Sequence, residues 1–249
     1  MKYLITILGY ARTGTNYLSG FLGSTFSNIN SNYELFNRKE CYMNQKYLNM
    51  LNKYDLTENP ILFLEKLIDI SEEPIISHKI FPEHLALNDV FQIIDTSDYL
   101  IIMKRNFIDV YISKKRAMTM MNEHSNSNPW INIDTTHYKI EFNKDEFEDQ
   151  KKIYDDWYGT LLNYIIKKNK KYYFIDYDSF HSLNLLDKQC LIKEELGKAI
   201  PLELLTINPD IETLNKQDKS SDYKTKIINY EEFINYIDLK PRRHSLLIY

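Results

Sequence analysis

The sequence feature that most constrains the fold lies near the N-terminus, where a short apolar run ends in a glycine-bounded turn. Residues Leu4 to Leu8 are apolar apart from one threonine, and Gly9 and Gly14 enclose the segment Tyr10-Ala11-Arg12-Thr13. Apolar residues at helical spacing follow, at Leu18, Phe21 and Leu22. A continuous apolar run indicates a strand buried on both faces. We therefore predict a parallel strand, a tight turn and a helix, with the run read as a strand rather than as a secretory signal.

Similar alternations recur along the chain. Further strands are predicted at 29–34, 75–81, 99–103 and 172–176, of which 99–103 is the clearest apolar run. Helical spacing predicts helices at 60–70, 107–120, 145–169, 183–196 and 230–237. This order predicts an α/β fold, P-loop-NTPase-like, with a mainly parallel sheet flanked by helices. We see no repeat or linker, so one domain over 1–249 is expected. The polar stretch at about 122–143 is interpreted as a loop or lid, and residues 208–237 as a C-terminal covering segment.

The turn after the first strand predicts an anion site. The N–H groups at the start of a helix have no partner within it, and the helix dipole favours negative charge there. Gly9 and Gly14 match the spacing of the nucleotide-triphosphatase loop, but Thr15 replaces its lysine and Asn16 its magnesium-binding hydroxyl. The positive charge lies instead within the turn, at Arg12. A plain strand-to-helix turn is the alternative interpretation.

A second candidate anion site follows the predicted strand 99–103. Arg105 comes at its carboxyl end, where open α/β sheets bind ligands, and Ser113 lies about two helical turns later. The guanidinium offers a planar fork to phosphate oxygens, and Asp109 is placed to orient it. A solvated surface arginine is the alternative. Together with the first turn, this site suits a ligand with two separated phosphate groups, such as 3′-phosphoadenylyl sulfate (PAPS).

These residues resemble the PAPS-dependent sulfotransferase family, closer to bacterial carbohydrate-type members than to cytosolic animal enzymes. The family's 5′-phosphosulfate motif [KR]-[ST]-G-[ST]-[TN]-[WY]-L is matched by Arg12, Thr13, Gly14, Thr15, Asn16, Tyr17 and Leu18. Its 3′-phosphate motif R-N-P-x-D-x-x-x-S-x-x-x-A is matched by Arg105, Asn106, Asp109, Ser113 and Ala117, with Phe107 replacing the proline. Weaker similarities concern Tyr177, implied near the adenine, and Lys216 and Gln217, implied in a closing C-terminal loop.

The resemblance implies sulfuryl transfer from PAPS to a hydroxyl or amine, with adenosine 3′,5′-bisphosphate (PAP) as product and no metal. Arg12 is then expected to stabilise the leaving phosphate oxygen. Glu34 resembles the glutamate of an "E-L-F" segment that faces the acceptor, which favours a carbohydrate. His78 is a second candidate base, although alignment on Pro82 puts the family histidine at Ile80. Lys79, on the same strand, is a candidate contact for sulfate or acceptor.

Two other classes of function remain open at this point. A P-loop kinase needs a lysine at the position of Thr15, and a non-catalytic nucleotide-binding protein predicts damaged phosphate motifs. The formal charge of −4 and pI of about 5.9 argue against a nucleic-acid surface. No run reaches the roughly 20 apolar residues of a membrane span. Two cysteines outside any metal spacing favour a reducing, cytoplasmic setting. The acceptor and the oligomeric state are not readable from the sequence.

Overall fold

The structure of the protein, a computed structural model, contains a parallel β-sheet. The structure describes residues 1–37, 41, 43, 45–48, 50–51, 59–123, 138–209 and 222–239. Within them, five strands pair in the order β2-β3-β1-β4-β5, all parallel. Their bounds are β1 Tyr3–Leu8, β2 Ile29–Ser31, β3 Ile75–Ile80, β4 Tyr99–Lys104 and β5 Tyr172–Asp176. The predicted α/β fold, with a P-loop-like strand, turn and helix at its start, is confirmed.

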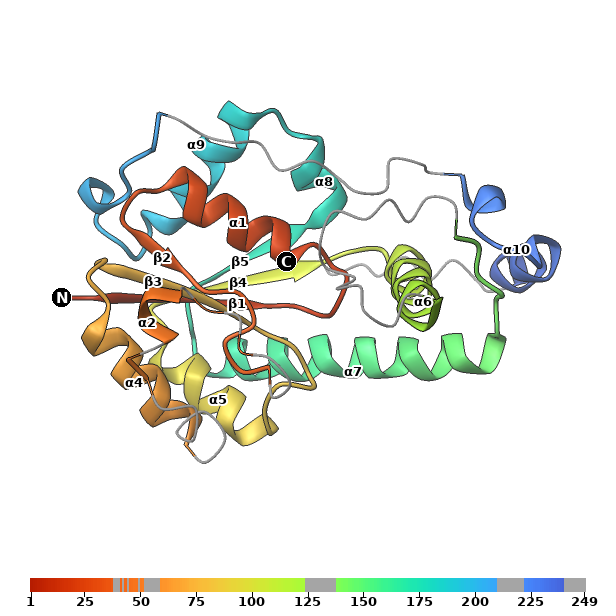
Figure 1. The fold of residues 1–249 in the computed structure, drawn as a ribbon, viewed down its shortest axis with the longest axis horizontal. Helices are drawn as coiled ribbons and strands as arrows, with labels where there is room; N and C mark the ends of the chain where they lie inside the picture. The colour runs from red at the N-terminus through yellow and green to blue at the C-terminus, as the bar shows by residue number, and fades with distance from the viewer. Residues whose placement is uncertain are drawn as a thin grey trace. The chain divides into compact units, whose positions relative to one another are not determined.

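The central strands β1, β3 and β4 are buried along almost their whole length, and β1 and β4 are accordingly apolar runs in the sequence. On one face α1 (Thr15–Thr25), α8 (Tyr177–Ser182) and α9 (Leu185–Leu196) cover the sheet (Figure 1). Leu18, Phe21 and Leu22 of α1 enter this core at helical spacing. On the other face lie α4 (Pro60–Ile70) and α5 (Leu87–Thr96). The helix α2 (Gln45–Leu48) and the 3-10 helix η1 (Leu202–Leu204) complete the elements of this region.

The chain divides into two compact units. The first comprises Met1–Arg105 and Trp157–Leu214 and contains the whole sheet, and the second comprises Asn106–Asp156 and Asn215–Tyr249. The second contains α6 (Phe107–Glu123), η2 (Tyr223–Thr225) and α10 (Tyr230–Leu239), and α7 (Lys144–Lys167) runs from the second unit into the first. The expectation of one domain over 1–249 stays a prediction.

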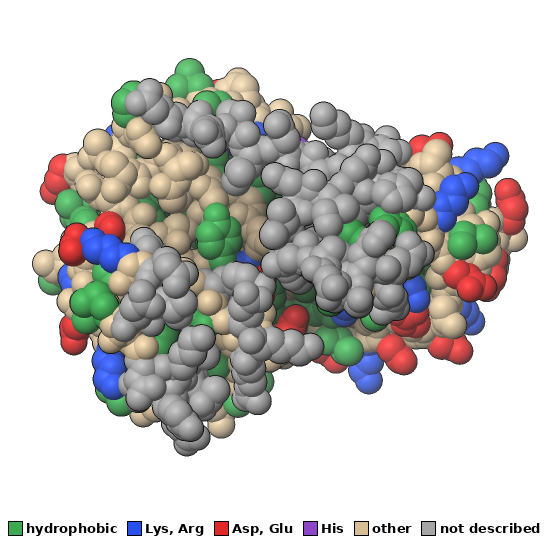
Figure 2. Space-filling view, viewed as in Figure 1, with side chains coloured by type: hydrophobic (Ala, Val, Ile, Leu, Met, Phe, Trp, Pro, Cys, Tyr) green, Lys and Arg blue, Asp and Glu red, His purple; other side chains and the backbone are tan. Residues whose placement is uncertain are grey.

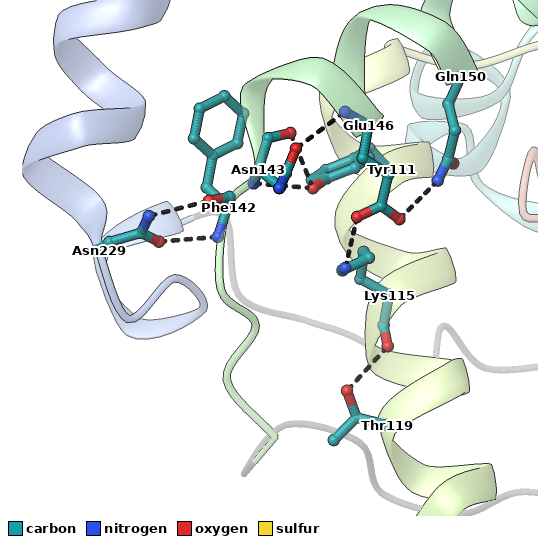
Figure 3. Close-up of polar contacts among 8 residues, drawn as sticks. All are labelled: Tyr111, Lys115, Thr119, Phe142, Asn143, Glu146, Gln150 and Asn229. Carbon is teal, nitrogen blue, oxygen red and sulfur yellow. Dashed lines mark hydrogen bonds and ion pairs between the residues drawn. The ribbon is translucent and has the colours of Figure 1, made fainter.

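Side-chain hydrogen bonds join separate segments of the second unit (Figure 3). The Asn229 amide accepts from the Phe142 N–H at 2.7 Å and donates to the Phe142 carbonyl at 2.9 Å. The Tyr111 hydroxyl of α6 accepts from the Asn143 N–H at 3.2 Å. A backbone bridge pairs Ile140 with Ile227. The described end of the predicted 122–143 loop is therefore attached to the segment before α10, and residues 124–137 lie outside the described residues.

Charged side chains are distributed unevenly over the surface in view. Acidic side chains are frequent on the helices of the second unit, and Lys and Arg side chains are scattered singly (Figure 2). The first turns of α7 and α10 each contain two acidic residues, whose negative charges interact favourably with the positive end of the helix dipole. In this view, the described residues present no broad basic surface of the kind that nucleic acids require.

Candidate active site

The turn between β1 and α1 is held in a strained conformation. The Tyr10 carbonyl accepts hydrogen bonds from the Thr13 N–H at 3.2 Å and the Thr13 hydroxyl at 2.7 Å. Arg12 has φ 71 and Gly14 has φ 90, both in the left-handed region. Non-glycine residues adopt this region rarely, and observed strain of this kind clusters at ligand sites. The turn ends with Gly14 as the N-cap of α1, so the first N–H groups of that helix open beside it.

Tyr177 packs directly against this turn. A Cβ atom on Gly14 would lie 2.1 Å from the Tyr177 Cδ2 atom and 2.3 Å from Cε2, so no other residue fits there without displacing the ring. Tyr177 is the first residue of α8, a helix capped by the Asp176 carboxylate, which accepts from the Ser179 N–H at 2.9 Å. The ring is 6 % exposed. Two segments far apart in the chain, both predicted to bind the nucleotide, are therefore in contact.

Two arginines converge on the same turn. Arg105, which follows β4, donates from Nη1 to the Arg12 carbonyl at 3.4 Å, and its guanidinium lies 4.8 Å from the centre of the Tyr177 ring. Burial and, to a lesser extent, the positive charge of Arg105 lower the pKa of Arg12. Burial raises the pKa of Tyr177, and the charge of Arg105 opposes that rise. This concentration of positive charge beside a helix N-terminus is suited to bind an anion.

A buried ion pair lies at the same edge of the sheet. Lys79 is the penultimate residue of β3 and is fully buried, and its Nζ lies 3.1 Å from Glu34 Oε1. The same ammonium donates to the Asn16 side chain in the first turn of α1. Burial lowers the pKa of Lys79 to about 8, Glu34 raises it, and Arg12 lowers it further. The structure therefore connects the predicted anion turn to the predicted base through one lysine.

Comparison with known proteins assigns the chain to a family. A family model described as "Sulfotransferase domain" matches residues 4–182, which include both arginines, Glu34, Lys79 and Tyr177. The chain belongs to the sulfotransferase domain family. A search of curated proteins gives no match. Among solved structures, the chain is similar to a sulfotransferase from Alicyclobacillus acidocaldarius, with 13 % identity and a TM-score of 0.46 over 96 % of this chain and 92 % of that one.

The sequence analysis missed two partners of Glu34 in this sulfotransferase. The Asn37 amide donates to Glu34 Oε2 at 2.7 Å, and His84 Nε2 lies 3.8 Å from the same oxygen. Asn37 follows Glu34 by three residues, a spacing that a turn brings together. His84 lies on another segment, just after β3, and only the pairing of strands in space brings it close. The sequence offered one local indication of where His84 lies: it follows Phe81 by three residues, and Pro82 between them favours a turn.

The structure places His78 away from this cluster. Successive side chains on a strand point to opposite faces, so His78 and Lys79 diverge. His78 Nε2 shares a 2.9 Å hydrogen bond with the Thr6 hydroxyl, which also contacts the Ser97 hydroxyl at 2.7 Å. Burial, with a smaller effect from His84, lowers the pKa of His78 to about 3. The histidine is thus a neutral residue of the sheet interior, and its role as a base is a prediction that this placement disfavours.

The remaining predicted residues of the sulfotransferase are distributed as follows. Thr13 and Thr15 are buried in the turn, Asn16 is exposed and Tyr17 is half-buried. Ser113 lies on α6 in the second unit, so its pairing with Arg105 stays a prediction. Lys216 and Gln217 lie outside the described residues.

The described residues contain neither a membrane-spanning helix nor a metal-binding cluster. No helix among them is long and apolar enough to cross a membrane. In the same residues, no three His, Cys, Asp or Glu side chains gather in a way that would hold a metal ion.

Proposed function

We propose that this sulfotransferase transfers a sulfuryl group from PAPS to a hydroxyl or amine of an acceptor and releases PAP. One observation carries the proposal: the guanidinium groups of Arg12 and Arg105 and the buried ammonium of Lys79 gather at one glycine turn. Lys79 is in turn paired with the Glu34 carboxylate. The cations suit a donor with anionic phosphate and sulfate groups, and the carboxylate suits an acceptor that must lose a proton. A kinase of the P-loop class would need a lysine where this chain has Thr15.

We assign each anionic end of the donor to a separate group of residues. The phosphosulfate is assigned to the turn from Arg12 to Tyr17, where backbone N–H groups and the Arg12 guanidinium are available. The 3′-phosphate is assigned to Arg105 together with Ser113. The Arg105 guanidinium lies over the Tyr177 ring, 4.8 Å from its centre, in a cation–π contact. We further propose that Lys216 and Gln217 cover the bound nucleotide.

The chemistry of the site follows from these charges. When bound, PAPS supplies an activated sulfuryl group whose transfer leaves negative charge on a phosphate oxygen. Arg12 and the helix N–H groups are fixed donors for that charge, and preorganised donors are usually the largest single contribution to such catalysis. Glu34 accepts the proton of the attacking hydroxyl or amine, a step typically worth about 10²–10⁴-fold in rate. Lys79 holds the Glu34 carboxylate at 3.1 Å and reaches Asn16 in the turn.

A carbohydrate is the acceptor class that we propose. Tyr33 is 39 % exposed next to the base, and the Lys79 ammonium lies 5.8 Å from the centre of its ring. A partly exposed aromatic ring beside a base offers a surface on which a sugar can stack. Trp157 is not available for this purpose, because it is buried and donates its indole N–H to the Gly9 carbonyl at 2.8 Å.

A binding experiment tests the donor. PAP should raise the melting temperature, since a ligand that binds only the folded state stabilises it by about 2.7 kcal/mol at a hundred times its dissociation constant. Arg105→Ala should remove most of the shift. Lys167→Ala, which removes an exposed lysine from the end of α7, is the control and should keep it. A shift with ATP and Mg²⁺ but none with PAP would refute the proposed donor.

A transfer experiment tests the base and the acceptor. Labelled PAPS should transfer its label to members of a panel of mono- and oligosaccharides. Glu34→Gln should abolish transfer while the melting shift with PAP remains. Unchanged turnover in Glu34→Gln would exclude Glu34 as the base.

A further inference from the structure

The turn after β3 holds the His84 ring in one orientation. The backbone N–H of His84 donates to the Phe81 carbonyl at 3.1 Å, and the backbone N–H of Phe81 donates to the ring nitrogen Nδ1 of His84 at 3.3 Å. The imidazole is 3 % exposed, with its centre 4.8 Å from that of the Phe81 ring. Because Nδ1 accepts a hydrogen bond from the backbone, a neutral ring carries its hydrogen on Nε2. The turn therefore fixes both the position and the tautomer of His84.

The nitrogen that carries this hydrogen faces the proposed base. His84 Nε2 lies 3.8 Å from Glu34 Oε2, and Asn37 Nδ2 donates to the same oxygen at 2.7 Å. The other oxygen, Oε1, lies 3.1 Å from Lys79 Nζ. A distance of 3.8 Å is long for a hydrogen bond, but catalytic contacts are commonly long in the free enzyme and shorten in the complex.

We propose that His84 is a positioning residue for Glu34. As a neutral imidazole, it directs its Nε2–H at Oε2 and keeps the carboxylate oriented to receive the proton of the acceptor. This inference rests on the proposed function, because it takes Glu34 as the base. It adds a residue that acts through Glu34 and does not itself contact the reacting atoms.

Burial keeps the His84 ring neutral. Burial lowers the pKa of His84 to about 4, Glu34 opposes this, and the positive charge of Lys79 adds to it. At neutral pH the imidazole is therefore a hydrogen-bond donor without charge. An imidazolium would compete with Lys79 for the same carboxylate, so neutrality preserves the ion pair between Lys79 and Glu34.

Two substitutions separate a positioning role from a merely structural one. In His84→Gln the amide nitrogen can take the place of Nε2 and donate to Glu34, but the contact with the Phe81 N–H is lost. In His84→Asn the amide oxygen can take the place of Nδ1 and accept from Phe81, but nothing reaches Glu34. A positioning role predicts that Gln retains more activity than Asn. A role confined to holding the turn predicts the reverse order.

The kinetic readout uses labelled PAPS with the saccharide panel. We expect His84→Asn to lower kcat about tenfold or more, part of the contribution of a positioned base, with the KM for PAPS unchanged. His84→Gln should recover most of that loss, and both variants should keep the wild-type melting shift with PAP. Wild-type kcat in His84→Asn, or a lower kcat in His84→Gln than in His84→Asn, would overturn the inference.

A spectroscopic readout works without an acceptor. In long-range ¹H–¹⁵N spectra at neutral pH, His84 should show an acceptor-type Nδ1 and a donor-type Nε2, and Glu34→Gln should move its Nε2 resonance. His78 serves as the control and should not respond, since its Nε2 faces Thr6. A hydrogen on Nδ1, or no response to Glu34→Gln, would overturn the inference. If wild-type protein neither binds PAP nor transfers label, the proposed function fails, whereas these spectra still decide whether His84 contacts Glu34.

Discussion

The buried Lys79 predicts an unusual dependence of stability on pH. Its pKa is about 8 in the folded protein and 10.5 in an unfolded chain, because burial disfavours the charged ammonium. Between these values the unfolded state binds more protons than the folded state. The free energy of unfolding must therefore rise as pH increases through this window. The shift predicts a gain of about 2 kcal/mol from this one group between roughly pH 7 and pH 9.5.

Urea denaturation across this pH range measures the effect, compared between wild type and the double variant Glu34→Gln/Lys79→Met. The double variant removes both charges together, since removing one partner of a buried pair typically costs about 3–5 kcal/mol and risks unfolding. Other groups titrate in both proteins and cancel in the difference. Several buried tyrosines have raised pKa values, which lowers stability above about pH 10, so the comparison stops below that value. Equal pH dependence in the two proteins would refute the assignment of a lowered pKa to Lys79.

The remaining predictions concern the turn and its supports. Gly14→Ala should lower stability by about 2 kcal/mol or more and abolish the melting shift with PAP, because φ is 90 and the new Cβ would meet Tyr177. Gly159→Ala, within α7 and with open space around its Cβ, should instead be neutral or stabilise by up to about 1 kcal/mol in the same denaturation assay. Trp157→Phe should cost about 1–3 kcal/mol and weaken PAP binding measured by calorimetry, because the Gly9 carbonyl loses its indole donor. Unchanged PAP affinity in this variant would separate the indole contact from the shape of the turn.

The central strands β1 and β4 were predictable because they are buried on both faces and are therefore continuous apolar runs in the sequence. The predicted bounds of β5 and α4 agree with the structure, and Asn59 caps α4 just before Pro60. The second strand was predicted too long, to residue 34, whereas β2 ends at Ser31. Backbone hydrogen bonds to β3 nevertheless continue to Tyr33, whose carbonyl accepts from the Lys79 N–H at 3.2 Å. The chain bends at residues 33–34, and this places Glu34 beside Lys79.

Two helices were not predicted from the sequence. One is α5, whose N-cap Ala86 makes no side-chain hydrogen bond, so the usual start signal is absent. The other is α8, a short helix that begins directly at the end of β5. Phosphate motifs are contiguous in sequence and could be read directly. The contact of His84 with Glu34 could not, because it depends on where two separate segments leave the sheet.

The arrangement of cations in the site has its own energetic consequence. Arg12 and Arg105 lie close enough that the charge of one lowers the pKa of the other, and Lys79 is buried nearby with a lowered pKa. The repulsion between these cations and the burial of their charges raise the free energy of the folded protein when no anion is present. An anion bound among them adds an attractive interaction with each cation, and this attraction offsets the cost of holding the cations together. The cluster therefore favours an anionic ligand over a neutral one, and binding of PAP should raise the pKa of Lys79. In ¹⁵N spectra of the Lys79 ammonium, a titration midpoint that stays near 8 when PAP is bound would show that the cluster acts without this coupling.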